Sequence, residues 1–177
     1  MYKIAHISDS HISFADQDSH GKKLIELLSD IKERNCDHVV LTGDVADNPN
    51  RKDLLYVREI LSHFGLLDSN LLTIIPGNHD IFGGAPKGPD FFRFVMMCSE
   101  INYDEKADMF IEIFKETFPN NHSFPFLKII NNIALIGINS VDRFSEKKNP
   151  EGSNGKISKE DFKKIKTIIP ITGIEVQ

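Results

Sequence analysis

The stretch Val39-Val40-Leu41-Thr42-Gly43-Asp44 decides the fold that we predict for this chain. Its three consecutive apolar side chains are typical of a β-strand that is covered on both faces. Similar strands are expected at Tyr2–Ser8 and Leu71–Ile75, and apolar residues recur at helical spacing between the strands, over residues 24–35 and 54–64. The order strand, helix, strand, helix, strand predicts an α/β protein with a parallel sheet.

The region from residue 81 to residue 121 interrupts this alternation. A glycine-rich and proline-rich loop at residues 83–89 precedes two expected helices, at residues 90–100 and 105–118. Nine of the 13 phenylalanines lie between Phe82 and Phe126. The region is either a helical insertion whose rings pack on the sheet, or a lid that is hinged at the glycines.

A hairpin and a last helix are predicted after this region. Two strands, at residues 124–130 and 133–138, flank Asn131-Asn132, which is a tight-turn signal. Ser158 is expected to cap a helix whose lysines face solvent. Four apolar residues are expected on the inward face of that helix: Phe162, Ile165, Ile168 and Ile169.

Composition and charge exclude several classes of protein. The 177 residues suffice for about one domain. The net charge is −5, whereas a protein that binds nucleic acid independently of sequence carries an excess of basic residues. Two cysteines are too few for a disulfide scaffold or a thiolate metal site. No apolar run is long enough for a membrane span, and the N-terminus leaves no room for a targeting segment, so a cytoplasmic protein is expected.

Polar motifs follow each of the three predicted parallel strands. They are Asp9-Ser10-His11, Gly43-Asp44 and Gly77-Asn78-His79-Asp80. In open α/β sheets, ligands bind beyond the carboxyl ends of the strands. We therefore expect the three motifs to meet at one edge of the sheet.

Together these motifs carry the donor atoms of a divalent metal site. Asp9, His11, Asp44, Asn78 and His79 supply carboxylates, imidazoles and an amide oxygen, which suit Mn²⁺, Fe²⁺ or Zn²⁺. Asp44 is the expected bridge between two ions, because it lies between the other two motifs. Taken singly, each residue is better explained as a turn, cap or ordinary polar residue, and only their joint placement favours a metal site.

Other polar residues are weaker candidates. Asn139 ends the fifth predicted strand on the same side, and Arg143 is a candidate contact for a phosphate. Among the remaining histidines, His6 is expected to be buried in its strand or to lie behind the site, and His38 is expected at the surface or at a cap position.

The pattern D-x-H, G-D, G-N-H-D resembles the calcineurin-like metallophosphoesterase family, from Tyr2 to about residue 169. Residues 155–157 are similar to the cyclic-nucleotide-phosphodiesterase-like branch. The resemblance implies the family's α-β-β-α sandwich fold, of which this chain is the N-terminal part. Residues 1–177 are then a single domain, incomplete at its C-terminus, with residues 81–121 as a helical insertion.

The resemblance also implies a role for each motif residue. Asp9 and His11 would bind the first of two divalent ions, Asp44 would bridge both, and Asn78 would bind the second. A metal-bound hydroxide would attack the phosphate ester, and His79 would protonate the leaving group or stabilise its charge. The carboxylate of Asp80 would lie behind the ligands and orient one of them.

The sequence departs from the family pattern near its end. The family continues with a further histidine and a G-H-x-H motif, whereas no histidine follows His122 here. The chain is expected to be part of a longer protein, or else a short variant with an incomplete site. Residues 171–176 are read as the beginning of the next strand or its replacement. By itself, the chain is expected to bind one ion better than two and to turn over little substrate.

The expected function is metal-dependent hydrolysis of a small phosphate ester, either a phosphodiester or a monoester. Two alternatives remain. A DNA-processing nuclease subunit would need a basic channel, which the net charge does not support. A protein-binding scaffold with an incomplete site would bind metal weakly. An incomplete sheet would also leave an apolar edge unpaired, which favours homo-oligomers.

Overall fold

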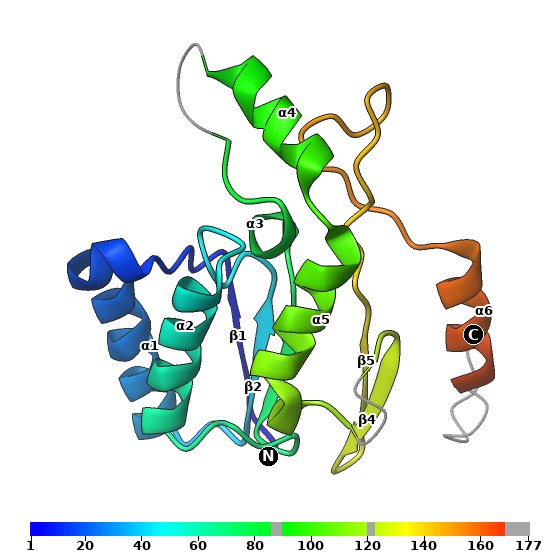
Figure 1. Cartoon of the computed structure of the whole chain (residues 1–177). Helices are drawn as coiled ribbons and strands as arrows, with labels where there is room; N and C mark the ends of the chain where they lie inside the picture. Colours follow the sequence, from blue (N-terminus) through cyan, green and yellow to red (C-terminus); the bar gives the residue numbers. More distant parts are fainter. Residues whose placement is uncertain (86–89, 120–122, 169–177) are drawn as a thin grey trace.

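A three-stranded parallel sheet forms the centre of the molecule (Figure 1). The computed structural model describes residues 1–85, 90–119 and 123–168, with the backbone alone at residues 16–18. Strands β1 (Ile4–Ser8), β2 (His38–Thr42) and β3 (Leu72–Ile75) lie side by side in that order, and both pairs are parallel. The predicted α/β class and the three predicted strands are confirmed.

Helices α1 (Lys22–Glu33) and α2 (Arg51–His63) cover one face of this sheet (Figure 1). Their buried leucines and valine pack on the strand residues that share this face, and all belong to one core: Leu24, Leu28, Leu54, Val57, Leu61, Val39, Leu41, Leu72 and Ile74. Asn50 caps α2 by accepting a hydrogen bond from the Asp53 backbone N–H. Short turns at Phe14–Asp16 and Gln17–Gly21 lead into α1.

Helix α5 (Tyr103–Ile113) and the hairpin complete this core. Phe110 and Phe114 of this region are fully buried in it, together with Phe118 and Phe126. A short 3-10 turn (Lys115–Thr117) connects α5 to strands β4 (Phe126–Ile130) and β5 (Ile133–Gly137), which pair antiparallel as predicted. The hairpin is a sheet of its own, because it shares no ladder with β1–β3.

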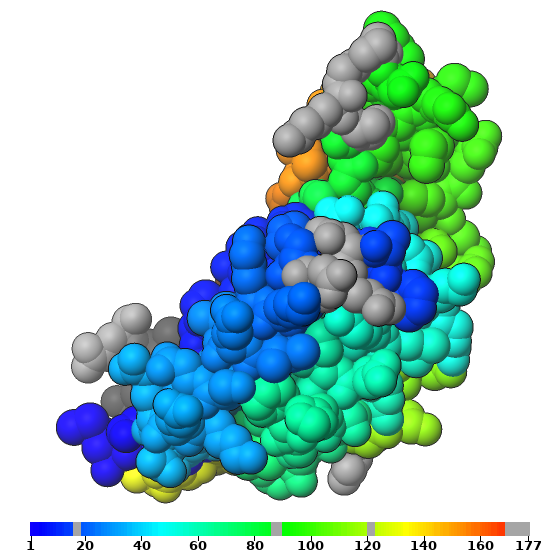
Figure 2. Space-filling view, turned by 90° about the vertical axis from the view of Figure 1, so that its left-hand side faces the viewer, coloured from blue at the N-terminus to red at the C-terminus, as the bar shows by residue number. Residues whose placement is uncertain are grey.

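A second apolar cluster lies beyond the sheet. Helices α3 (Asn78–Ile81) and α4 (Phe91–Glu100) meet the 141–152 loop there, and Phe82, Phe94, Cys98 and Val141 form its centre. This region of the chain therefore packs in two ways, since Phe110 of α5 lies in the main core, whereas Tyr103 of α5 and Phe94 of α4 lie in the second cluster. Figure 2 shows α4 projecting beyond the body of the molecule. Four apolar residues of α4 are exposed: Phe91, Phe92, Met96 and Met97.

Helix α6 (Lys159–Ile168) begins where the sequence predicted. The Ser158 hydroxyl accepts a hydrogen bond from the Asp161 N–H at 2.9 Å, so it caps the helix. All four lysines of the helix are exposed, as expected. Phe162 was expected to face inward, but it is 52% exposed, and only Ile165 is buried on this helix. Ile169 and residues 171–176 lie outside the described residues.

Two histidines of the sheet differ from expectation. His6 on β1 is exposed, whereas His38 on β2 is buried. The His38 Nδ1–H donates to the Asn70 carbonyl at 2.8 Å, and Nε2 accepts from the Thr73 hydroxyl at 2.9 Å. Within the described part of the chain, β1 and β3 are the two edge strands, and His6 shares the exposed face of β1 with Ile4 and Ser8. None of the described helices combines the length and apolar character needed to cross a membrane.

Candidate metal centre

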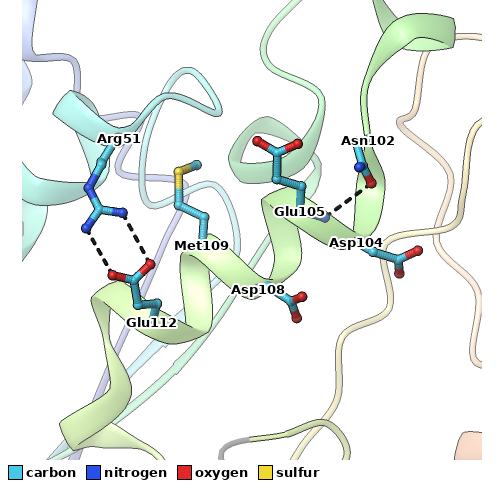
Figure 3. A pocket seen from close by; sticks show the side chains of 7 residues that line it. All are labelled: Arg51, Asn102, Asp104, Glu105, Asp108, Met109 and Glu112. Carbon is cyan, nitrogen blue, oxygen red and sulfur yellow. Dashed lines mark hydrogen bonds and ion pairs between the residues drawn. The ribbon is translucent and has the colours of Figure 1, made fainter.

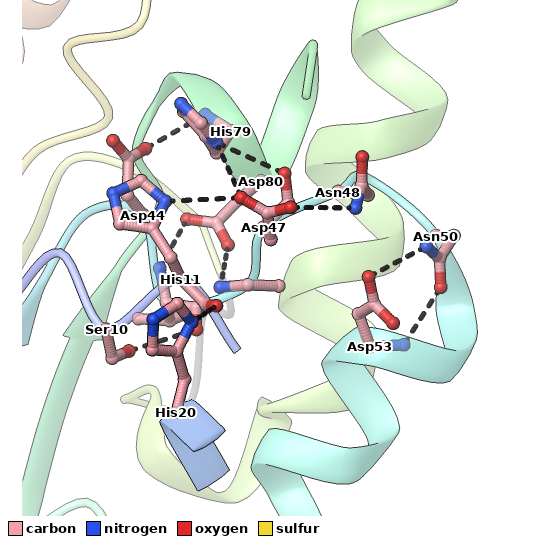
Figure 4. Close-up of polar contacts among 12 residues, drawn as sticks. Ser10, His11, His20, Asp44, Asp47, Asn48, Asn50, Asp53, His79 and Asp80 are labelled. Carbon is pink, nitrogen blue, oxygen red and sulfur yellow. Dashed lines mark hydrogen bonds and ion pairs between the residues drawn. The ribbon is translucent and has the colours of Figure 1, made fainter. Parts of the chain in front are cut away.

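The loops that follow the three parallel strands are bonded to one another (Figure 4). The Asp9 N–H donates to the Gly43 carbonyl at 3.2 Å, and the His11 N–H donates to the Asp44 carbonyl at 2.9 Å. The His79 N–H, at the start of α3, donates to Asp44 Oδ1 at 2.9 Å. The motif that follows β2 is thus held between the other two, as the strand order predicted.

Three of the predicted ligands come together at this edge. The side chains of Asp9, His11 and Asp44 each offer one donor atom, and these atoms all lie within 4.8 Å of one another. Two carboxylates and an imidazole are suitable donors for a divalent transition ion. The sequence prediction that these residues converge is confirmed.

The same three residues adopt a backbone conformation that is unfavourable for L-amino acids. Asp9, His11 and Asp44 have φ angles of 56°, 45° and 48°. Residues other than glycine enter this left-handed region at a cost of roughly 1–3 kcal/mol each. The two other described examples, Asn35 and Asn131, end a helix and form the hairpin turn. The three residues that offer these donor atoms, which we call the ligand group, therefore all carry this backbone cost.

His11 shows that the pocket between these residues suits a cation. Its Nδ1 atom is buried and has no hydrogen-bond partner among the described residues. The nearest acidic oxygen, Asp47 Oδ1, is 3.6 Å away, which is too long for a hydrogen bond. A buried polar atom without a partner is costly, and a bound ion would place and polarise this ring. The residues present therefore fit a divalent metal.

Asn78 lies at the first position of α3, directly after β3. Its carbonyl accepts a hydrogen bond from the Phe82 N–H at 2.7 Å. Its side-chain amide makes no hydrogen bond with the described residues, so it is available as a ligand. That role stays a prediction.

His79 lies next to His11 and contacts Asp47. Its ring lies edge to face with the ring of His11, with centroids 4.4 Å apart. Its Nδ1 atom is 3.1 Å from the Asp47 carbonyl oxygen and 3.5 Å from Asp47 Oδ1. Because a carbonyl can only accept, we assign the proton of the neutral ring to Nδ1. Nε2 is then the nitrogen that can exchange a proton with a bound molecule.

Asp47 is the residue that the sequence analysis missed. It lies between the two imidazoles, and His11, Asp47 and His79 form a second group of donor atoms within 4.8 Å of one another. The sequence feature that could have identified Asp47 is its position three residues after Asp44, in the loop that follows β2. That loop runs towards α3, so a side chain at this point reaches both histidines (Figure 4).

Asp80 lies beneath the site and is fully buried. Its carboxylate accepts hydrogen bonds from the N–H groups of Gly77 at 2.8 Å, Ala46 at 2.8 Å and Val45 at 3.2 Å. Burial raises the pKa of Asp80 to about 7, against the lowering effect of these donors, and the charge of Asp44 adds to the rise. Asp80 therefore ties the loop after β2 to the loop after β3 through backbone groups.

Two weaker candidates lie elsewhere. The Arg143 guanidinium forms a two-point ion pair with Asp104 and stacks 4.5 Å from the Tyr103 ring. The Asn139 amide donates to the Tyr103 hydroxyl at 3.0 Å. Both side chains are thus engaged around Tyr103, and neither belongs to the ligand group.

Two hollows differ in their suitability for an anionic ligand. A groove of about 770 Å³ runs along α5 (Figure 3), but its wall carries four acidic side chains and one cation, Arg51, which is paired with Glu112. A pocket of about 290 Å³ adjoins Asp9 and His11 and is also lined by His20 and Lys23. Because the four acidic side chains of the first groove repel anions, the second hollow is the more suitable of the two for an anionic ligand.

Comparison with known proteins agrees with the geometry. No curated protein matches the chain. A family model described as calcineurin-like phosphoesterase matches residues 2–175, which include all three motifs and the whole candidate metal centre. The chain therefore belongs to the calcineurin-like phosphoesterase family.

Proposed function

We propose that this protein is a metal-dependent hydrolase of small phosphate esters, and that its centre is the group Asp9, His11 and Asp44. One observation carries the proposal. Two separate loops, which follow β1 and β2, bring two carboxylates and an imidazole within 4.8 Å of one another, at the carboxyl edge of the sheet, in a member of a phosphoesterase family.

The described residues offer unequal support for two ions. Asp9, His11 and Asp44 would hold the first, whereas Asp44 and Asn78 alone would hold the second. A divalent ion held there would act as a Lewis acid on the phosphate and make water a stronger nucleophile near neutral pH. Because the second set has only two donors, we expect this chain to bind one ion more tightly than the other.

His79 would exchange the proton with the leaving group. Its Nε2 atom is the free nitrogen, because Nδ1 faces Asp47. Asp47 would orient this ring, because its carbonyl oxygen lies 3.1 Å and its carboxylate oxygen 3.5 Å from Nδ1. General acid catalysis of this kind contributes typically about 10²- to 10⁴-fold in rate.

The pocket beside Asp9 and His11 supports a substrate of modest size. Lys23 is exposed at its wall and has no ion-pair partner among the side chains that the structure describes. His20 lines the same wall, and its Nδ1 atom is 3.0 Å from the His11 carbonyl oxygen. A cation beside the ligand group favours the anionic leaving group or body of a phosphate ester.

Metal binding tests the ligand assignment directly. Mn²⁺ is titrated into the full chain and into the D44N variant, with calorimetry and electron paramagnetic resonance as readouts. We expect the affinity to fall by about tenfold or more in D44N. The matched control is D108N, which changes an exposed aspartate of the acidic α5 groove and should bind Mn²⁺ normally. Equal affinity in D44N and the unmodified chain would contradict the assignment.

Hydrolysis of bis-p-nitrophenyl phosphate with Mn²⁺ tests the activity. We expect H79A to keep Mn²⁺ affinity while its hydrolysis rate falls by about 10²-fold or more. A scaffold protein would instead show weak Mn²⁺ affinity and no hydrolysis that depends on Asp44. Hydrolysis at equal rates in H79A and the unmodified chain would show that His79 has no part in the reaction.

A further inference from the structure

Gly84 lies directly against the imidazole of His79, five residues after it in the sequence. A Cβ atom at position 84 would be 2.6 Å from Cε1, 3.0 Å from Nδ1 and 3.6 Å from Nε2 of that ring. The first distance is shorter than real Cβ atoms tolerate. The backbone at Gly84 therefore occupies the space beside the Cε1 end of the ring, between its two nitrogens.

The ring of His79 is thereby confined on three sides. The ring of His11 meets it edge to face, with centroids 4.4 Å apart. The Asp47 carbonyl oxygen lies 3.1 Å from Nδ1, and Gly84 closes the Cε1 side. With these three neighbours in place, rotation of the ring would break the contact of Nδ1 with Asp47 or bring Gly84 into collision.

Gly83 explains how the backbone reaches this position. It has a φ of 86°, and its N–H donates to the His79 carbonyl at 3.0 Å. This left-handed turn bends the chain back over the end of α3. Gly84 itself has no such φ, so alanine fits its backbone conformation. What opposes alanine at position 84 is the His79 ring, and not local backbone strain.

We propose that Gly84 is a positioning residue, whose missing side chain lets the backbone hold the His79 imidazole with Nδ1 on Asp47 and Nε2 free. This inference rests on the proposed function only for its effect on catalysis. The contact itself is independent of any reaction. It also means that the insertion leading to α4 begins at the wall of the site.

The test uses G84A, H79A and the double variant G84A/H79A in the full chain. G155A is the matched control, because a Cβ there would meet only the Ser140 carbonyl oxygen at an ordinary 3.5 Å. The imidazole C–H signals of His79 are assigned by their absence in H79A. We expect them to shift in G84A and to stay in place in G155A.

Thermal unfolding supplies a readout that needs no activity. G84A should lower the Tm by about 3–10 °C, since overpacking forces neighbours to move. In the H79A background the same change should have no further effect, because alanine at position 79 leaves room for the new methyl group. If G84A fails to fold and the double variant folds, the same conclusion follows.

Hydrolysis then links the contact to the reaction. In G84A we expect kcat to fall by about 10- to 100-fold with KM changed less than about twofold, because the ring is displaced rather than the substrate site. Unshifted His79 signals in G84A, or an equal loss of Tm in both backgrounds, would overturn the proposal. If H79A hydrolyses normally while the signals and Tm behave as expected, the proposed catalytic role of His79 fails and the contact stands.

Discussion

Replacing Lys128 by methionine should make the stability of the protein less dependent on pH. Lys128 lies on β4, its side chain is 5% exposed, and its Nζ atom donates to the Leu72 carbonyl on β3 at 2.5 Å. It forms no ion pair with the described residues within 4.0 Å. Burial lowers the pKa of Lys128 from 10.5 to about 8, and the more distant charge of Asp68 opposes this only in part.

The size of the effect follows from that pKa. A fall from 10.5 to about 8 corresponds to about 3 kcal/mol of unfolding free energy, since each pH unit is worth about 1.4 kcal/mol. Between these pH values the unfolded chain binds more protons than the folded chain. The folded state therefore gains stability as the pH rises from about 8 to about 10.5, and it carries the full cost of the charge below pH 8.

K128M should remove both the cost and the pH dependence. Methionine loses the hydrogen bond to Leu72, which is worth about 1.5–3 kcal/mol for a charged donor, so the net gain at pH 7 should be small, about 0–2 kcal/mol. The measurement is urea unfolding at several pH values from 7 to 10.5. The control is K163M, which removes an exposed lysine of α6. If K128M kept the same rise of stability with pH as K163M, the reasoning would be refuted.

Three further changes probe the loops and caps. Ser158→Ala removes the cap of α6 and should cost about 1 kcal/mol, seen as faster amide exchange in that helix; unchanged exchange would contradict it. Gly152→Ala places a Cβ 2.3 Å from the Phe82 ring at a φ of 66°, so the Tm should fall by several degrees, while an unaltered Tm would count against this packing. Asp80→Ala leaves three N–H groups without their acceptor, and Mn²⁺ affinity should fall by about 10- to 100-fold in the folded variant. Normal affinity would show that the loops after β2 and β3 hold their positions without the Asp80 carboxylate.

The strands and the ligand group could be predicted from the sequence for one reason. Each motif directly follows an apolar strand, and parallel strands must end at the same edge of their sheet. Asp9, His11 and Asp44 are therefore placed by topology alone. Asp47 is not, because it lies beyond the strand end in a loop, and only the path of that loop brings it between the two histidines.

The two histidines of the sheet show where sequence patterns fail. His38 is paired with Ile4 in register, and His6 is two residues further along β1, so both lie on the same face of the sheet. His38 is buried near Lys128 of the hairpin, which helps to lower its pKa after the larger effect of burial. His6 is exposed, although Thr73 is buried on the same face of the other edge strand. Alternation along a strand shows which face a residue takes, but not what covers it.

Phe162 was mispredicted for a related reason. Its spacing from Ile165 is correct for one face of a helix, yet Phe162 is 52% exposed. Figure 1 shows α6 to one side of the hairpin, away from the parallel sheet. Lys166 instead places its ammonium 4.7 Å from the centre of the Phe162 ring. Helical periodicity predicts a shared face and cannot predict that a partner for this face is present.

The left-handed backbone at Asp9, His11 and Asp44 implies a conflict between the stability of the fold and the presence of donor side chains at these positions. Glycine adopts a positive φ without steric cost, so replacing each of these residues by glycine should remove the backbone strain. Selection for thermal stability alone would therefore favour glycine at these positions. Every such exchange would delete a donor atom. The stability of the protein is thus lower than it could be, and the loss is located at the three residues that we propose as metal ligands.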